Sequence, residues 1–481
     1  LGAYNVVKTT VGTTSGTSGY AIGLGNSVTG SYGTALGTGN KAAGISSTSI
    51  GTANQANGNT AIALGRQSYA EGDYSIAQGN LANASANNAI AIGSQTKASG
   101  QANISLGVGA SSGAIASGTA DGIPLNGGGQ IAIGKNAYTS TAGSIAIGND
   151  TKTGDNNNFG LAIGGYAEAT GNSAVAMGRR SQALAQNSTA IGGRITKATA
   201  GGATAIGSAA EASGVEASAL GAGLGTDTST NKTVASGNQS LAVGTGSSAS
   251  NTYSTAIGGA TSSQESAIAI GRGAQASNLN AVAMGAYAAA TGDGALALGG
   301  NATAGAKATN TDAIAIGGQS VASGVSSIAQ GLNAQALGAH ANAFGRNSVA
   351  AGNNALTLGG WSTDGTTITY AGLNGGAAYN GSLAARYATS IGSTNALLSG
   401  STVGIGNRIT IGNNNPISTL ADLNDGALTK AYGASSSSHA VGIGDNLKIN
   451  GGSRYAVAIG ADIIVNQNSP DSFAFGRAAE I

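Results

Sequence analysis

The chain has 481 residues, of which 84 are glycine and none is cysteine, and its net charge is +1. The lack of cysteine excludes disulfides and thiolate metal sites, and a charge this close to zero gives no basic field for nucleic acid. Charged residues are 8% of the chain, against about 25% in ordinary globular domains. The apolar fraction of 41% also argues against a disordered chain. This composition favours a thin β-architecture built from small side chains.

A short Ala/Ile-type run that ends in glycine recurs along the chain. It is AIALG at 61–65, AIAIG at 89–93, SIAIG at 144–148, and AVAMG at 174–178 and 281–285. The closing glycines, called marker glycines below, follow one another in steps of 14 residues over long stretches. Such a fixed period indicates a repeat architecture. We expect the repeat to depend on marker glycines such as Gly65, Gly93, Gly148, Gly178 and Gly285.

A second half-motif follows each marker glycine. Small residues stand three and five positions later, and a second glycine often stands seven positions later, as Gly72 does after Gly65. Each half is too short for a stable helix but suits a strand of about 4–5 residues. We expect positive φ at both glycine corners, and Asn251 and Asn278, which replace the second glycine in two copies, tolerate that conformation. The repeat therefore predicts two strands per 14-residue rung, stacked as parallel ladders in a β-solenoid, or β-roll.

The two predicted strands differ in their outward faces. The middle position of the second strand is often polar, as at Gln55, Lys97, Lys152, Glu168, Gln275 and Gln335. The first strand is apolar on both faces, because alanine and isoleucine alternate in it. Its isoleucines, including Ile90, Ile92, Ile145 and Ile147, would form an exposed apolar row on a monomer. The sequence therefore predicts self-association, without fixing the number of chains.

The runs SIAIG, AVAMG and NAVAMG (280–285), on their 14-residue step, resemble the head repeats of YadA-like trimeric autotransporter adhesins of Gram-negative bacteria. The resemblance implies a left-handed parallel β-roll intertwined as a homotrimer. It also implies display at the end of a surface fibre, outside the cell, anchored in the outer membrane through a C-terminal region. We interpret the sequence as a piece of such a longer protein, and no stalk heptads or transmembrane pattern are seen in it.

Four spacers exceed one rung by a wide margin: Gly107–Gly134, Gly221–Gly244, Gly359–Gly392 and Gly412–Gly444. We expect each to leave the roll as a loop or hairpin. The predicted organisation is head repeats over 1–359 with insertions at about 108–130 and 222–240, an aromatic-bearing insertion over 360–390, and less regular repeats over 391–481 that lead toward the stalk.

The aromatic-bearing insertion holds Trp361, Tyr370, Tyr379, Arg386 and Tyr387. Tryptophan, tyrosine and arginine are over-represented at binding hot spots, and surface loops on rigid scaffolds often bind ligands. These five residues are therefore the candidate ligand-binding set. The alternative is that they pack a small core of the insertion or an oligomer contact.

No constellation of catalytic residues is readable. His340 and His439 stand without cysteine or clustered acids and are interpreted as surface residues. The GDG at 292–294 does not recur as calcium-binding repeats require, and Arg179-Arg180 is interpreted as a solvated corner rather than a nucleic-acid patch. We predict no enzyme activity, no metal, no cofactor and no membrane contact within this sequence.

The leading functional hypothesis is adhesion to extracellular matrix proteins, host or bacterial cells, or abiotic surfaces, with weak contacts repeated along a rigid object. An ice-binding solenoid is an alternative, although its flat threonine row is missing: the outward positions include Gln55, Tyr69, Lys97, Tyr138 and Glu168. A segment of a phage tail fibre or spike is a third possibility, distinguished by its genomic context or its C-terminal anchor.

Overall fold

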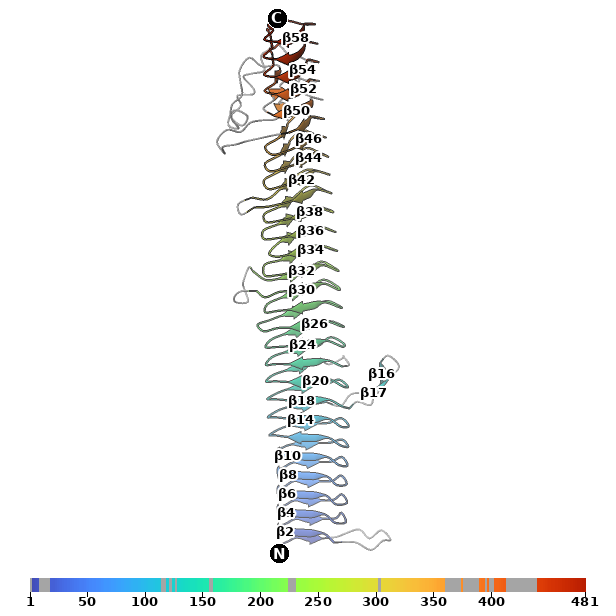
Figure 1. Ribbon diagram of the computed structural model, residues 1–481. Coiled ribbons are helices and arrows are strands. Elements are labelled where there is room, and N and C mark those ends of the chain that lie inside the picture. Colours follow the sequence, from blue (N-terminus) through green and yellow to red (C-terminus); the bar gives the residue numbers. More distant parts are fainter. Residues whose placement is uncertain are drawn as a thin grey trace. The chain divides into compact units, whose positions relative to one another are not determined.

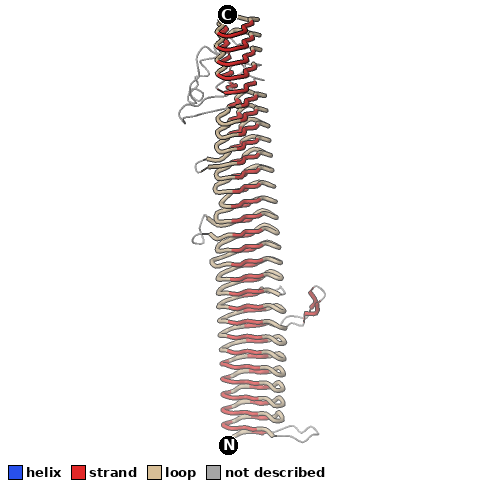
Figure 2. The backbone as a smooth tube through the Cα atoms, viewed as in Figure 1, coloured by secondary structure: helices blue, strands red, loops and turns tan. Residues whose placement is uncertain are grey.

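The computed structural model gives the chain as two compact units, Leu1–Gly246 and Ser247–Ile481. It describes residues 2–7, 18–113, 118–120, 123–125, 128–154, 159–223, 231–301, 304–359, 373–374, 389–393, 396–397, 402–411 and 439–481. These residues form strands and corners and contain no helix (Figures 1 and 2). The predicted all-β parallel solenoid with a spacing of about 14 residues is confirmed.

In the first unit, one parallel sheet is made of the first strand of each rung (Figure 1). Its strands are β2 (Tyr20–Leu24), β4 (Thr34–Thr38), β6 (Thr48–Thr52), β8 (Ile62–Arg66), β10 (Ile76–Asn80), β12 (Ile90–Ile92), β14 (Ile104–Leu106), β18 (Ile131–Ile133), β20 (Ile145–Ile147), β22 (Leu161–Ile163), β24 (Val175–Met177), β26 (Thr189–Ile191), β28 (Thr204–Ile206), β30 (Ser218–Leu220) and β32 (Leu241–Val243).

The second parallel sheet of this unit is made of two-residue strands, shorter than the sequence predicted, because the corners take up the rest of each half-rung. They are β1 (Val6–Val7), β3 (Ser27–Val28), β5 (Lys41–Ala42), β7 (Gln55–Ala56), β9 (Tyr69–Ala70), β11 (Asn83–Ala84), β13 (Lys97–Ala98), β15 (Ser111–Ser112), β19 (Tyr138–Thr139), β21 (Lys152–Thr153), β23 (Glu168–Ala169), β25 (Gln182–Ala183), β27 (Lys197–Ala198), β29 (Glu211–Ala212) and β31 (Val234–Ala235).

The second unit repeats this plan. Its first strands are β34 (Thr255–Ile257), β36 (Ile268–Ile270), β38 (Val282–Met284), β40 (Leu296–Leu298), β42 (Ile314–Ile316), β44 (Ile328–Gln330), β46 (Asn342–Phe344), β48 (Leu356–Leu358), β50 (Thr389–Ser393), β52 (Val403–Asn407), β54 (Val441–Asp445), β56 (Val457–Ala461) and β58 (Phe473–Arg477). Its short strands are β33 (Ser248–Ala249), β35 (Thr261–Ser262), β37 (Gln275–Ala276), β39 (Ala289–Ala290), β41 (Lys307–Ala308), β43 (Val321–Ala322), β45 (Gln335–Ala336), β47 (Val349–Ala350), β49 (Leu373–Asn374), β51 (Ala396–Leu397), β53 (Thr410–Ile411), β55 (Lys448–Ile449) and β57 (Ile464–Val465).

The register of both sheets joins equivalent positions of successive rungs. Val175 of β24 pairs with Leu161 of β22 and with Thr189 of β26, while Gln182 of β25 pairs with Glu168 and Lys197. Each side chain therefore stacks on the same position of the neighbouring rungs, about 4.8 Å away.

One predicted insertion leaves the solenoid as a hairpin. Strands β16 (Gly118–Ala120) and β17 (Ile123–Leu125) pair antiparallel between rungs that end at Gly107 and Gly134, and they lie beside the stack in Figure 1. A smaller excursion that the sequence analysis did not single out carries an antiparallel bridge between Gly300 and Gly305.

The core between the two sheets is built from alanine and small polar residues. In one rung, Ala174 and Ala176 of the first half face Ser181 and Ala183 of the second, and all four are fully buried. These are the inward positions that strand alternation predicts. Because these side chains are so small, the two sheets lie close together at this rung.

Positive φ is found at the marker glycines, as predicted, but at the second corner it is found at a different residue from the one predicted. The marker glycines have φ near +120°, for example +121° at Gly65. The second glycine does not have positive φ, and neither do Asn251 and Asn278; the left-handed residue stands two positions later, as Ser173 does after Gly171. Gly171 is small for another reason: an added β-carbon would run into the backbone of Ala185 in the next rung.

Buried asparagines form a ladder in the first rungs of the first unit. Asn40 donates from Nδ2 to the carbonyls of Leu36 (3.0 Å) and Gly51 (2.8 Å). Its Oδ1 accepts from the backbone N of Asn54 (3.2 Å) and from that residue's Nδ2 (3.0 Å). The ladder therefore gives these carbonyls a buried side-chain donor in addition to the backbone pairing of the sheet.

The core of the last rungs changes character. The short strands there, and the residues directly before them, supply large aliphatic side chains that cluster with buried alanines: Leu397, Ile409, Ile411, Leu447, Ile449, Ile463 and Val465. The first strands place Gly404, Gly442, Ala458 and Ala474 at their inward positions. In these rungs the larger inward side chains therefore come from the short-strand sheet, and the first-strand sheet supplies glycine or alanine opposite them.

Candidate interaction surfaces

The outward face of the first strands is an uncharged and mainly aliphatic surface, called the aliphatic row below, in which some rungs carry threonine, serine, glutamine, asparagine or an aromatic residue instead. It consists of the side chains before and after each inward alanine, such as Ile90 and Ile92 of β12 and Ile145 and Ile147 of β20. These side chains are half-buried by their stacked neighbours, and Ile147 is 36% exposed. Within the described first strands, no charged residue stands at either outward position. Successive side chains of a strand point to opposite faces. Because the alanines point into the core, the larger aliphatic residues between them point outward.

The outward face of the short strands is polar and irregular. Gln55, Tyr69 and Glu168 are half-buried there, and Lys97 is exposed. Successive rungs bring lysine beside glutamate, as at Lys152 and Glu168. Because charge, size and shape change from rung to rung, this face lacks the flat row of threonines that an ice-binding solenoid needs.

The marker glycines position both faces. Gly93, Gly148, Gly178 and Gly285 have φ of +133°, +141°, +111° and +123°. A β-carbon on Gly178 would meet the carbonyl oxygen of Gly192, the marker of the next rung. Glycine is therefore needed both for its conformation and for the closeness of successive rungs.

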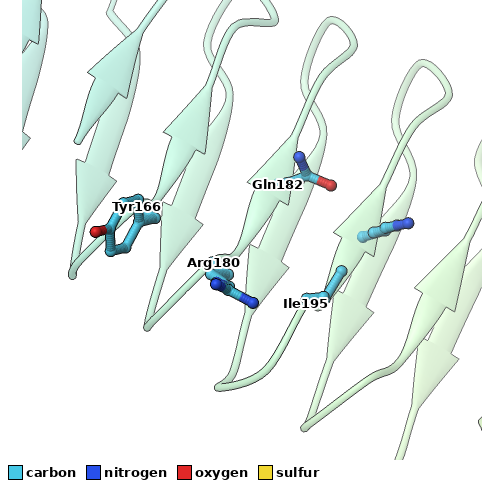
Figure 3. A pocket seen from close by; sticks show the side chains of 5 residues that line it. Tyr166, Arg180, Gln182 and Ile195 are labelled. Carbon is cyan, nitrogen blue, oxygen red and sulfur yellow. The ribbon is translucent and has the colours of Figure 1, made fainter. Parts of the chain in front are cut away.

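A hollow opens on the short-strand side of the first unit. It is lined by Tyr166, Arg180, Gln182, Ile195 and Lys197, which come from three successive rungs, and its volume is about 260 Å³ (Figure 3). Tyr166 and Arg180 project from equivalent corners, while Gln182 lies on β25. The Arg180 guanidinium carbon lies 5.9 Å from the centre of the Tyr166 ring.

Arg179-Arg180 is predicted from the sequence to be a solvated corner, and both residues are exposed with Arg180 at a left-handed corner position. The hollow beside them is not predicted from the sequence. A signal was present: the step from Gly192 to Gly207 is 15 residues, so this rung has one residue more than its neighbours. Arg194 and Ile195 both have positive φ there, of 55° and 59°.

The histidines show no catalytic setting. His340 stands exposed at a corner, and the ring of His439 stacks on that of Tyr455 with centroids 5.0 Å apart. Over the part of the chain that the structure describes, no group of three or more His, Cys, Asp or Glu side chains is placed to hold a metal ion.

The predicted ligand-binding set, Trp361, Tyr370, Tyr379, Arg386 and Tyr387, lies outside the described residues. Its role stays a prediction. The predicted domain boundaries at 359, 390 and 391 likewise remain predictions.

A family model described as "YadA head domain repeat (2 copies)" matches many rungs of both units. The matched segments are 42–68, 70–96, 131–151, 160–180, 169–194, 235–261, 262–288, 290–307, 308–334 and 329–355. The chain carries a YadA-like head domain. No curated protein matches the sequence.

The matches to the YadA-like head leave a gap in the first unit between residues 194 and 235. The match over 169–194 ends at Arg194, immediately before Ile195 in the 15-residue rung, and the next begins at 235. Three residues of the hollow, Tyr166, Arg180 and Gln182, therefore lie within matched repeats, whereas Ile195 and Lys197 lie outside them. The hollow therefore lies across the end of a matched segment.

Across the described residues of the YadA-like head there is no helix that is both long enough and apolar enough to span a bilayer.

Proposed function

We propose that this chain is the head of a homotrimeric autotransporter adhesin, in which three left-handed β-rolls intertwine in parallel. The observation that carries the proposal is the aliphatic row. An uncharged, half-exposed face that continues from rung to rung is much larger than the apolar patches that monomeric proteins expose. Three parallel copies around a common axis would cover all three rows equivalently.

The short-strand face would then point away from the trimer axis. Its polar, irregular side chains support a role in contacting matrix proteins, host or bacterial cells, or abiotic surfaces. Three copies of every contact, repeated along a rigid object, give avidity without strong single contacts. The head would act outside the cell, attached to the outer membrane through a further C-terminal region. We propose that it binds and has no enzyme activity of its own.

The oligomeric state tests the proposal directly. Multi-angle light scattering on the purified chain is expected to give three times the 45.5 kDa of one chain. A stable mass of 45.5 kDa would contradict the trimer, and it would require another cover for the aliphatic row.

Adhesion is tested on the same preparation. Fluorescent chain is expected to bind wells coated with collagen or fibronectin, cultured epithelial cells, or bare polystyrene, above an albumin-blocked control. Binding to none of these surfaces by a confirmed trimer would leave the assembly intact and contradict the adhesive role.

No observation favours the ice-binding alternative, because the outward short-strand row mixes tyrosine, lysine, glutamine and glutamate. The tail-fibre alternative has no specific feature in its favour among the described residues.

A further inference from the structure

The hollow formed by Tyr166, Arg180, Gln182, Ile195 and Lys197 combines two cations, an amide, an aromatic ring and one aliphatic side chain. Such a mixture is typical of a ligand site, where a few placed polar groups fix the orientation of a bound molecule. All five side chains come from one chain and from the short-strand side, opposite the aliphatic row. Covering the aliphatic row would therefore leave the hollow open.

The extra residue in the rung after Gly192 makes the hollow. In a regular rung, the short strand begins four residues after the marker, as at Gln182 after Gly178; here Lys197 is the fifth residue after Gly192. The additional residue requires two consecutive left-handed residues, Arg194 and Ile195. Left-handed residues stand at corners throughout the solenoid, but Arg194 and Ile195 are the one consecutive pair among the described residues that carry a β-carbon.

The cations of the hollow are available to a ligand. Within the described residues, neither Arg180 nor Lys197 takes part in an ion pair. Arg180 borders the Tyr166 ring, which is 53% exposed. Arginine can bind a carboxylate with two parallel hydrogen bonds, and lysine adds a second, more flexible positive charge.

Acidic groups on either side limit how much negative charge can be bound. Glu168, on the same rung as Tyr166, accepts a hydrogen bond from Nε2 of Gln182 at 3.2 Å. On the rung after, Glu211 lies beside Lys197 in the sheet register and 3.8 Å from Lys232. A dense polyanion such as nucleic acid would meet both carboxylates. A ligand with a single negative group fits between them.

The exposed face of Tyr166 and the Gln182 amide favour a sugar as the carrier of that negative group. An aromatic face is apolar and packs against the apolar face of a sugar ring, and an amide can both donate to and accept from hydroxyl groups. The volume of about 260 Å³ is small for a peptide segment but suits one monosaccharide unit.

We propose that this hollow binds a carboxylated monosaccharide unit of a glycan. Its carboxylate lies against Arg180 and Lys197, its ring packs on Tyr166, and a hydroxyl group contacts Gln182. This inference deepens the proposed adhesive function by naming a class of ligand. The binding itself needs the residues of one chain only.

Saturation-transfer NMR and titration calorimetry test the site on the whole chain. The probes are α2,3-sialyllactose and a hyaluronan tetrasaccharide, which carry the carboxylate on two different sugars, with lactose as the neutral control. We expect one or both acidic probes to bind and lactose not to bind. Equal binding of lactose, or no binding of either acidic probe, would overturn the proposal.

Variants assign the binding to the hollow. Arg180→Gln and Lys197→Gln are each expected to weaken binding about tenfold, the loss that follows removal of a hydrogen bond to a charged group. Lys97→Gln is the matched control, because Lys97 occupies the equivalent short-strand position on a rung without the hollow. Tyr166→Phe should bind like the parent, and Tyr166→Ala should bind more weakly. Unchanged affinity in both cation variants would overturn the assignment.

Two further outcomes separate the alternatives. A glutamate-rich hexapeptide that competes as well as the sugars would replace the glycan by an acidic peptide and overturn the proposal. Binding through Arg180 by a chain of monomeric mass would support this site while contradicting the trimer. A trimer that adheres to surfaces but binds neither acidic sugar would overturn this inference alone.

Discussion

Gly404 lies against Leu397: a β-carbon added to Gly404 would stand 2.8 Å from Cδ2 of the leucine. Leu397 is fully buried in the aliphatic cluster of the last rungs. In most other rungs the corresponding first-strand position holds alanine and the short strand holds alanine or another small residue. The contact shows that a larger side chain on the short strand is accommodated by a smaller residue on the first strand, so that the distance between the two sheets is kept.

This contact predicts a compensating pair of substitutions. Gly404→Ala should destabilise the second unit, because the added methyl group overlaps Leu397. Leu397→Ala should cost about 2–5 kcal/mol through the cavity it leaves. The double variant should lose about 1 kcal/mol less unfolding free energy than the two single variants lose together, because the effects of residues in contact are not additive. Hydrogen exchange of amides in β52 and β54 measures each loss locally, and strict additivity would contradict the packing.

The marker glycines predict a contrast between two glycine substitutions. Gly65→Ala introduces a β-carbon at φ +121° and against the carbonyl oxygen of Gly79. Its cost should exceed the about 1–3 kcal/mol of backbone strain alone. Gly39→Ala is the control: its φ is +65° and its added β-carbon meets nothing within 4 Å. The equivalent corner position of the next rung already holds Ala53, with φ 57°.

Thermal denaturation followed by circular dichroism compares these two variants. We expect Gly39→Ala to stay close to the parent and Gly65→Ala to lose β-signal at a lower temperature. Equal melting temperatures would show that the close approach of successive rungs does not constrain the corner.

The asparagine ladder predicts that serine can replace Asn40 with a smaller loss of stability than alanine. Asn40→Ala leaves the carbonyls of Leu36 and Gly51 without the donor they now have. A buried group that loses its partner costs about 1–3 kcal/mol. Asn40→Ser should recover part of this, because Ser68 holds the same position two rungs later and its Oγ lies 3.0 and 2.8 Å from the carbonyl oxygens of Leu64 and Gly79. A hydroxyl has one hydrogen to donate, whereas the asparagine amide has two. Urea denaturation ranks the three proteins, and an alanine variant as stable as the serine variant would contradict the ladder's role.

The aliphatic row predicts where a charge will disrupt assembly. Ile90→Asp with Ile92→Asp places two carboxylates on the face that three copies would bury, and an unpaired buried charge is strongly unfavourable. We expect the light-scattering mass to fall or the chain to aggregate. Lys97→Asp, on the opposite face of the same rung, should leave the mass unchanged. A folded trimer formed by the double variant would place the oligomer contact elsewhere.

Much of the fold could be predicted because its rules are local. Strand alternation alone assigns Ala91 inward and Ile92 outward, and the 14-residue step aligns each with its neighbours. The second corner was predicted wrongly in one respect, since Asn251 and Asn278 do not have positive φ. Where this position holds glycine, as at Gly171, the restriction comes from the backbone of the next rung at Ala185, and no local pattern reveals such a contact.

The candidate site illustrates the same limit. The sequence drew attention to Arg179-Arg180 but gave no reason to join it with a lysine 17 residues later. Stacking brings Tyr166, Arg180 and Lys197 together because each stands on the next rung. The aromatic insertion around Trp361 keeps its predicted role as a second candidate surface.

The sequence by itself determined the period, the two strands of each rung, the alanine core and the uncharged aliphatic row. These features follow from side-chain alternation and from a pattern that recurs in each repeat of the sequence. Only the tertiary structure decided which glycines are restricted by a neighbouring rung, how Leu397 and Gly404 share one volume, and where an added residue opens a hollow. Those features depend on contacts between rungs, whose distances are set by the stacking of the sheets and not by any single repeat.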